Sequence, residues 1–174
     1  MECGRQNLRS QCRELSSSMR ATILSIGERM PGWVATGLAE YCKRLGRELP
    51  LELVALRSGL RTRKQPIQRA IEMEGAAMLA RVSATDRVIA LDGRGQTWSS
   101  EGLAKQLADW RMDGRNLVFL IGGADGLAPA LLDRAELRWS LGALTLPHML
   151  VRVIVAEQLY RAMCQLSGHP YHRG

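Results

Sequence analysis

The feature that most constrains the fold is a short apolar run that ends abruptly in glycines. Residues 117–121 read LVFLI, a run rich in residues that favour β-strands, and Gly122 and Gly123 follow at once. Pro129 suits the first turn of a helix, because its missing N–H would be unpaired there anyway. The stretch therefore predicts a strand, a glycine turn and a helix. In a parallel α/β sheet such turns lie at the carboxyl ends of strands, where ligands bind.

The same alternation of strand and helix patterns recurs along the chain. Strands are predicted at residues 21–26, 51–56, 88–91, 117–121 and near 141–146. Helices are predicted after Pro31, after Pro66, around Leu103, Leu107 and Trp110, after Pro129, and over residues 149–166. Five such alternations predict an α/β fold with a mostly parallel sheet and helices on both faces.

Length and composition set the scale of the folded unit. The 174 residues suit one domain, which would bury about 70% of its unfolded surface. The first 18 residues lack a clear period and end in three serines, so we expect a disordered extension or an upstream start. One domain is then expected over residues 19–174. No signal peptide or apolar run near 20 residues is visible, which predicts a cytoplasmic location.

The charge balance favours a polyanionic partner. The formal net charge is +7 and the pI about 9.8, a modest signal for nucleic-acid binding. Between residues 57 and 64 the chain carries Arg57, Arg61, Arg63 and Lys64 with no acid. This segment is either a solvated loop or a contact for RNA phosphates, and the sequence leaves both open.

The short motifs name no reaction by themselves. The DGRG segment after Leu91 and the GGADG segment after Ile121 are both predicted to be strand-to-helix turns. Neither matches the dinucleotide fingerprint or a Walker loop, and no serine-hydrolase elbow is present. The four cysteines and three histidines show no standard metal-site spacing, so no metal is expected. The residues alone indicate a basic α/β domain that binds a ligand at glycine turns.

Four segments in order resemble a known family. They are LDGRG at 91–95, LIGGADG at 120–126, WSLGALTLPHMLVRVIVAEQLYRA at 139–162 and HPYHR at 169–173. Together they resemble the SPOUT-class methyltransferases, and in particular the family that N3-methylates a pseudouridine in large-subunit (23S) ribosomal RNA. The likeness extends from about Met19 to the end of the chain.

The resemblance implies a C-terminal trefoil knot that holds S-adenosylmethionine. By position, the cofactor-binding residues would be Leu91, Gly122, Leu141, Gly142, Ala143, Leu144, Thr145 and Leu146. Gly122 is expected to let the backbone approach the cofactor, because it has no Cβ. Main-chain groups of residues 141–146 are expected to hydrogen-bond adenine, while the leucine side chains pack on it.

The resemblance also implies a homodimer with an active site built across the interface. The helix at 149–166 would be the main interface element. Tyr171, His172 and Arg173 would form the catalytic group: Tyr171 stacking on a base, His172 accepting a proton, and Arg173 with Arg152 holding phosphate. His148 would fix the turn at Pro147. The expected substrate is 23S ribosomal RNA within the assembled ribosome.

Two other functions remain open at this stage. One is a catalytically inactive module of the same fold that binds RNA or the ribosome. The other is a nucleotide- or NAD-binding oxidoreductase, indicated by the glycine turns alone. The missing dinucleotide fingerprint counts against the oxidoreductase.

Overall fold

The computed structural model describes residues 19–59 and 66–173, without the side chains of His172 and Arg173. Our expectations for residues 1–18 and for Arg61, Arg63 and Lys64 concern residues outside these ranges. Within them, the strands are β1 (Ala21–Ile26), β2 (Leu51–Leu56), β3 (Arg87–Thr97), β4 (Leu117–Ile121) and β5 (Leu137–Ser140). The helices are α1 (Gly32–Leu45), α2 (Ile67–Leu79), α3 (Ser100–Asp113), α4 (Pro129–Arg134), α5 (His148–Ser167) and the 3₁₀ helix η2 (Pro170–Arg173).

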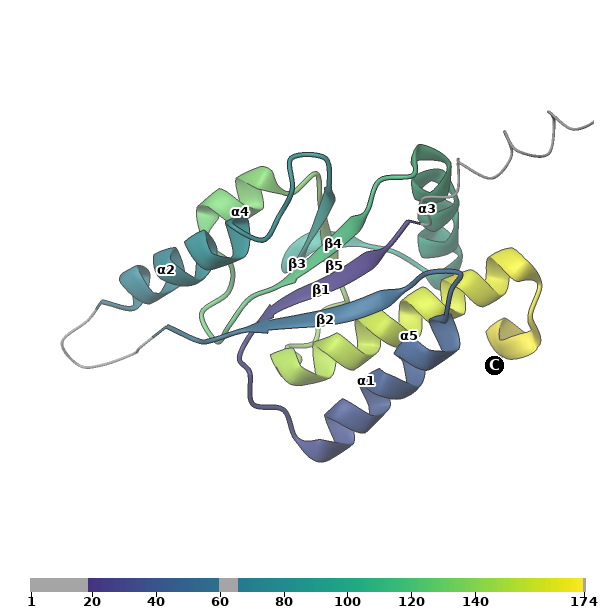
Figure 1. Ribbon diagram of the computed structural model, residues 1–174, viewed down its shortest axis with the longest axis horizontal. Helices are drawn as coiled ribbons and strands as arrows, with labels where there is room; N and C mark the ends of the chain where they lie inside the picture. The colour runs from purple at the N-terminus through teal and green to yellow at the C-terminus, as the bar shows by residue number, and fades with distance from the viewer. Residues whose placement is uncertain (1–18, 60–65, 174) are drawn as a thin grey trace, which may run out of the picture.

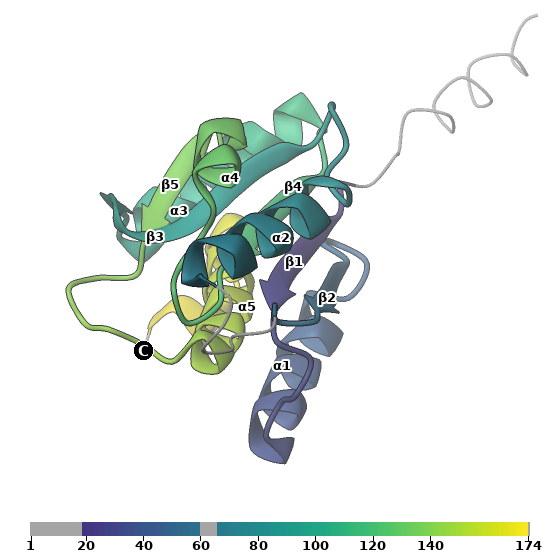
Figure 2. The same cartoon turned by 90° about the vertical axis from the view of Figure 1, so that its left-hand side faces the viewer.

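The five strands form one parallel sheet with helices on both faces, as predicted. The strand order is β2-β1-β4-β3-β5, and every neighbouring pair is parallel. Helices α1, α3 and α5 pack on one face, and α2 and α4 cover part of the other (Figures 1 and 2). In the described ranges, no helix is long and apolar enough to cross a membrane.

Alternation along the central strands explains the two layers. In β1, Ala21 and Ile23 face the cluster formed with α1, α3 and α5, whereas Leu24 and Ile26 face the cluster formed with α2 and α4. All five residues of β4 are buried. Such strands, apolar on both sides, are typical of parallel sheets covered by helices.

The third strand is longer than predicted. We expected a strand at 88–91 and a turn at Asp92–Gly95, but β3 continues to Thr97 with a register shift between Leu91 and Gln96 against β5. A Cβ on Gly95 would lie 2.5 Å from the carbonyl carbon and oxygen of Arg138. The glycines therefore mark an irregular, bulged strand with a close backbone approach, and the predicted turn was wrong.

The fifth strand was also misplaced. It covers Leu137–Ser140, and the apolar run at 141–146 has no regular secondary structure. The run was mistaken for a strand because it is apolar, yet Leu144 is 81% exposed. The Leu144 side chain is therefore available to something other than the protein core, whereas Leu141 packs against the core.

A buried arginine attaches α5 to the end of β1. Arg152 is 0% exposed. Its Nε donates to Ser25 Oγ at 3.0 Å, and its Nη2 donates to the carbonyl oxygens of Ile26 at 2.9 Å and Gly27 at 2.6 Å. The expectation that Arg152 holds phosphate was wrong, because its guanidinium is enclosed and already bonded to the strand end.

Replacing Arg152 tests this attachment. We expect Arg152→Met to lower the free energy of unfolding by about 2–4 kcal/mol, because two buried carbonyl oxygens lose their donor. Chemical denaturation would measure the change. Arg111→Met, an exposed position on α3, is the matched control and should change stability by under about 0.5 kcal/mol. Equal stability of the two variants would contradict this role.

Candidate functional site

A cleft of about 420 Å³ opens beside the irregular middle of β3 and the carboxyl end of β4. Its walls are residues 91–93 of β3, the glycine turn after β4 and the segment that joins β5 to α5. All eight residues predicted to bind the cofactor line it: Leu91, Gly122, Leu141, Gly142, Ala143, Leu144, Thr145 and Leu146. Three segments that are far apart in the sequence therefore meet around one hollow.

The glycine turn has a tighter backbone than its sequence suggests. A Cβ on Gly122 would lie 2.5 Å from the carbonyl carbon and oxygen of Gly126. The Gly126 N–H donates to the Gly123 carbonyl oxygen at 3.2 Å, and Gly126 has a φ of +87°. A glycine is thus required at position 122 because the backbone of Gly126 passes close to it. This requirement holds whether or not a ligand also approaches Gly122.

The segment at 141–146 presents backbone polar groups to the cleft. In the described part of the chain, none of these residues takes part in a backbone-to-backbone hydrogen bond. Ser140 braces the segment: its Oγ accepts from the Gly142 N–H at 3.3 Å and donates to the Gly142 carbonyl oxygen at 3.2 Å. Gly142 has a φ of +121°, a conformation that favours glycine. Amide groups that are not used in backbone-to-backbone pairing, beside apolar side chains, suit a heterocyclic ring with polar edges.

One acid in the cleft was not among the predicted site residues, because an isolated acid is more often solvated or capping than functional. Asp92 lines the cleft, and its side chain is only 12% exposed. It accepts hydrogen bonds from the Arg94 N–H at 2.8 Å, Nε at 3.2 Å and Nη2 at 3.1 Å. These bonds hold the pKa of the Asp92 carboxyl below its usual value. Its position immediately after the buried run ending in Leu91 was the available signal.

His148 is the second residue of the cleft that was not predicted there. It begins α5 and is half-buried. Burial and the nearby Arg152 guanidinium lower the pKa of His148, so its imidazole is neutral at pH 7. We expected His148 to fix the Pro147 turn, but its ring lines the cleft.

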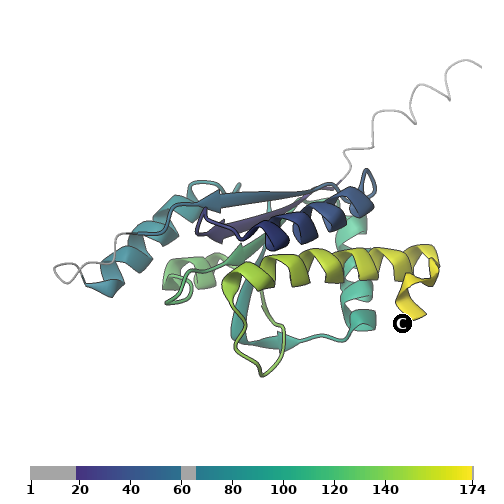
Figure 3. The same cartoon turned by 90° about the horizontal axis from the view of Figure 1, so that it is seen from below.

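The predicted catalytic tail lies at the other end of α5. Helix α5 has 20 residues, which corresponds to a length of about 30 Å. The cleft adjoins its first turn, whereas η2 follows its last turn (Figure 3). The structure therefore brings the cofactor-binding candidates together but places Tyr171 of the same chain away from them. The side chains of His172 and Arg173 lie outside the described part of the structure.

Tyr171 is held by α1 and α5. Its hydroxyl donates to Glu157 Oε1 at 3.3 Å and lies 3.3 Å from the Tyr41 hydroxyl. The guanidinium of Arg161, which pairs with Glu157, lies 5.0 Å from the Tyr171 ring centre. The hydrogen bond to Tyr41 and burial raise the pKa of Tyr171 above its ordinary value. A neutral, bonded phenol can position a neighbouring group but is a poor base.

Comparison with known proteins supports the resemblance. A family model described as "Predicted SPOUT methyltransferase" matches residues 19–172. The chain is 54% identical over 155 residues to the "Ribosomal RNA large subunit methyltransferase H" of Chromohalobacter salexigens, covering 89% of this chain and 100% of that protein. It is 49% identical over 155 residues to the protein of the same name from Ectopseudomonas mendocina, with the same coverage of both chains.

Solved structures share the fold at low sequence identity. A probable methyltransferase from Bordetella pertussis matches with a TM-score of 0.51 at 17% identity, covering 83% of this chain and 96% of that chain. A probable methylase family protein from Haemophilus influenzae matches with a TM-score of 0.52 at 12% identity, covering 88% of this chain and 70% of that chain. The family match spans nearly all described residues and agrees with the sequence motifs. The chain belongs to the SPOUT methyltransferase family.

Proposed function

We propose that this chain methylates N3 of a pseudouridine in 23S ribosomal RNA, acting on the assembled ribosome in the cytoplasm. Family membership makes it a methyltransferase that uses S-adenosylmethionine, and the curated relatives are named for the RNA of the large ribosomal subunit. The observation that carries the proposal is the cleft in which all eight predicted cofactor-binding residues meet.

The residues of the cleft fit the methyl donor. S-adenosylmethionine supplies an electrophilic methyl group on a sulfonium. The amide groups of residues 141–146 would pair with the adenine edges, and Leu91 and Leu141 would pack on its faces. The Asp92 carboxylate would favour a positively charged group. Among the described residues that line the cleft, Asp92 carries the only formal charge at pH 7.

A pair of glycines in the same cleft tests donor binding. We expect Gly122→Ala to weaken S-adenosylmethionine binding at least tenfold, because the added Cβ would collide with the Gly126 backbone and distort the turn. Gly93→Ala is the matched control, since Gly93 also lines the cleft but a Cβ there would meet nothing within 4 Å. Isothermal titration would give both dissociation constants. Equal weakening by the two changes would argue against this account of the turn.

In a homodimer, the C-terminal tail (residues 169–173) of one chain could lie beside the cleft of its partner. We propose that α5 packs against α5 of a partner in the antiparallel sense, so that each tail approaches the partner's cleft. Two observations support this. The cleft and the tail lie at opposite ends of one helix, and the partly exposed Leu150 and Ile154 give α5 an apolar surface outside the core cluster. Tyr171, His172 and Arg173 would then act as a group on the substrate beside the partner's donor.

Mixed dimers test an active site that is shared between chains. Gly122→Ala should disable the cleft and Tyr171→Ala the tail, so each homodimer should be inactive. Equal co-expression would make about half of the dimers mixed, and each would retain one intact composite site. We therefore expect methyl transfer to return to about a quarter of the wild-type rate. Activity no higher than that of the separate variants would refute the shared site.

We further propose that the segment between β5 and α5 closes a trefoil knot. The strand order places β5 at an edge of the sheet, while residues 141–146 return to the middle of β3 and the end of β4 before α5 begins. Knotted chains are rare exceptions to ordinary connectivity. An experimental backbone trace that closes without a knot would refute this proposal.

The proposed reaction is tested directly by methyl transfer to ribosomes that lack the modification. We expect labelled methyl from S-adenosylmethionine to appear in 23S RNA, at a pseudouridine that mass spectrometry of the digest identifies. Protein-free RNA should be a poorer substrate, because the assembled ribosome provides additional contacts. Donor binding without transfer to any ribosomal RNA would instead favour an inactive binding module.

A further inference from the structure

A second hollow adjoins the cleft proposed to bind S-adenosylmethionine, which is called the donor cleft below. It has a volume of about 570 Å³ and is formed by the loops that follow β1 and β2, the glycine turn and the start of α5. Gly123, Ala124 and His148 line both spaces. A molecule in this hollow would therefore lie next to a molecule in the donor cleft, which is the arrangement that a transfer between two substrates requires.

The hollow carries exposed positive charge. Arg29 and Arg57 line it and are both exposed, and Glu28 is the acid beside them. Arg57 Nε lies 3.3 Å from Glu28 Oε2, with the two side chains 87% and 54% exposed. Exposed ion pairs of this kind contribute little to stability, so the Arg57 guanidinium can exchange this partner for a phosphate at low cost.

The inner wall of the hollow offers a different chemistry. His148, neutral at pH 7, presents a ring nitrogen that can accept a hydrogen bond. The backbone of Gly123 and Ala124 lies beside it. Cations at the rim and a neutral acceptor inside match the two ends of a pseudouridine nucleotide, whose phosphate is anionic and whose base has ring N–H donors.

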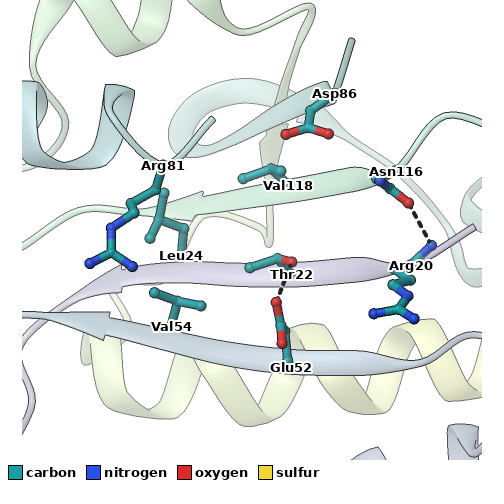
Figure 4. Close-up of a pocket in the computed structure, with 9 residues that line it drawn as sticks. All are labelled: Arg20, Thr22, Leu24, Glu52, Val54, Arg81, Asp86, Asn116 and Val118. Atoms are coloured by element: carbon teal, nitrogen blue, oxygen red, sulfur yellow. Dashed lines mark hydrogen bonds between the residues drawn. The ribbon is translucent and has the colours of Figure 1, made fainter. Parts of the chain in front are cut away.

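Another hollow, on the face of the sheet that α2 and α4 partly cover, lacks these properties. It has a volume of about 280 Å³ and lies over the amino-terminal halves of β1, β2 and β4 (Figure 4). Its cations Arg20 and Arg81 are balanced by Glu52 and Asp86, and Glu52 accepts from Thr22 Oγ1 at 3.3 Å. None of its lining residues is shared with the donor cleft. It therefore provides a matched control surface for the charged residues.

We propose that the hollow lined by Arg29, Arg57 and His148 receives the acceptor nucleotide of the RNA. The phosphate of a single unpaired nucleotide binds Arg29 and Arg57, and the base edge faces His148 beside the donor cleft. This inference rests on the proposed function, because it names where the RNA substrate of that function binds. It adds a binding site to a chain whose catalytic tail lies at the far end of α5.

Paired charge removals test the site. We expect the double variant Arg29→Ala with Arg57→Ala to raise the KM for ribosomes at least tenfold, with an unchanged dissociation constant for S-adenosylmethionine. The control double variant, Arg20→Ala with Arg81→Ala, removes the same charge from the other hollow and should change the KM less than twofold. All four side chains are exposed, so stability should be unaffected.

The possible outcomes separate this inference from the proposed function. A wild-type enzyme that methylates no ribosomal RNA would refute the proposed function itself. With wild-type activity present, a KM unchanged by the Arg29 and Arg57 changes, or raised equally by both double variants, would overturn the acceptor site. Sedimentation of both double variants gives a further check. If only the double variant at Arg29 and Arg57 fails to dimerise, the hollow holds the partner's tail, and the proposal of an acceptor site is wrong.

Discussion

The site depends on a buried guanidinium that joins the last helix to the first strand. Arg152 donates to the carbonyl oxygens at the end of β1 and to Ser25 within it, and these three acceptors are uncharged. Those bonds fix where α5 begins, one turn before Arg152, and so place His148 at the junction of the two hollows. Residues 141–147 must end where α5 begins. The bonds of Arg152 therefore also determine the position of this wall of the donor cleft.

Much of the fold could be predicted because buried strands carry simple signals. The runs at 21–26, 51–56 and 117–121 match β1, β2 and β4 in both bounds. The bounds of β3 and β5 were harder to predict because contacts with neighbouring segments determine them. The extension of β3 depends on a close approach to the backbone of Arg138, and the four-residue β5 alternates the exposed Arg138 with the buried Trp139. A short strand of that kind has no distinctive pattern of its own.

The site could be predicted only in part, since sequence does not show which way a side chain points. The eight cleft residues were identified by resemblance, and the structure gathers them at one edge of the sheet. Arg152 was expected to contact substrate, but its place on the inner face of α5 buries it. Tyr171 was expected to contact the substrate in a site built across two chains, and within one chain the length of α5 separates it from the cleft. The number of residues between two sites does not predict their distance in the folded chain.

The carboxylate of Asp92 makes the cleft sensitive to charge as well as shape. Arg94 keeps the Asp92 carboxylate ionised and partly offsets its charge. Because the Arg94 side chain is 79% exposed and screened by water, whereas most of the Asp92 side chain is hidden from solvent, a net negative field remains in the cleft. A sulfonium loses its positive charge when it becomes a thioether, although the rest of the molecule keeps its outline. The same cleft would therefore hold a fresh donor more tightly than its spent form. Exchange of the spent donor for a fresh one would then be favoured by the charge difference between the two molecules.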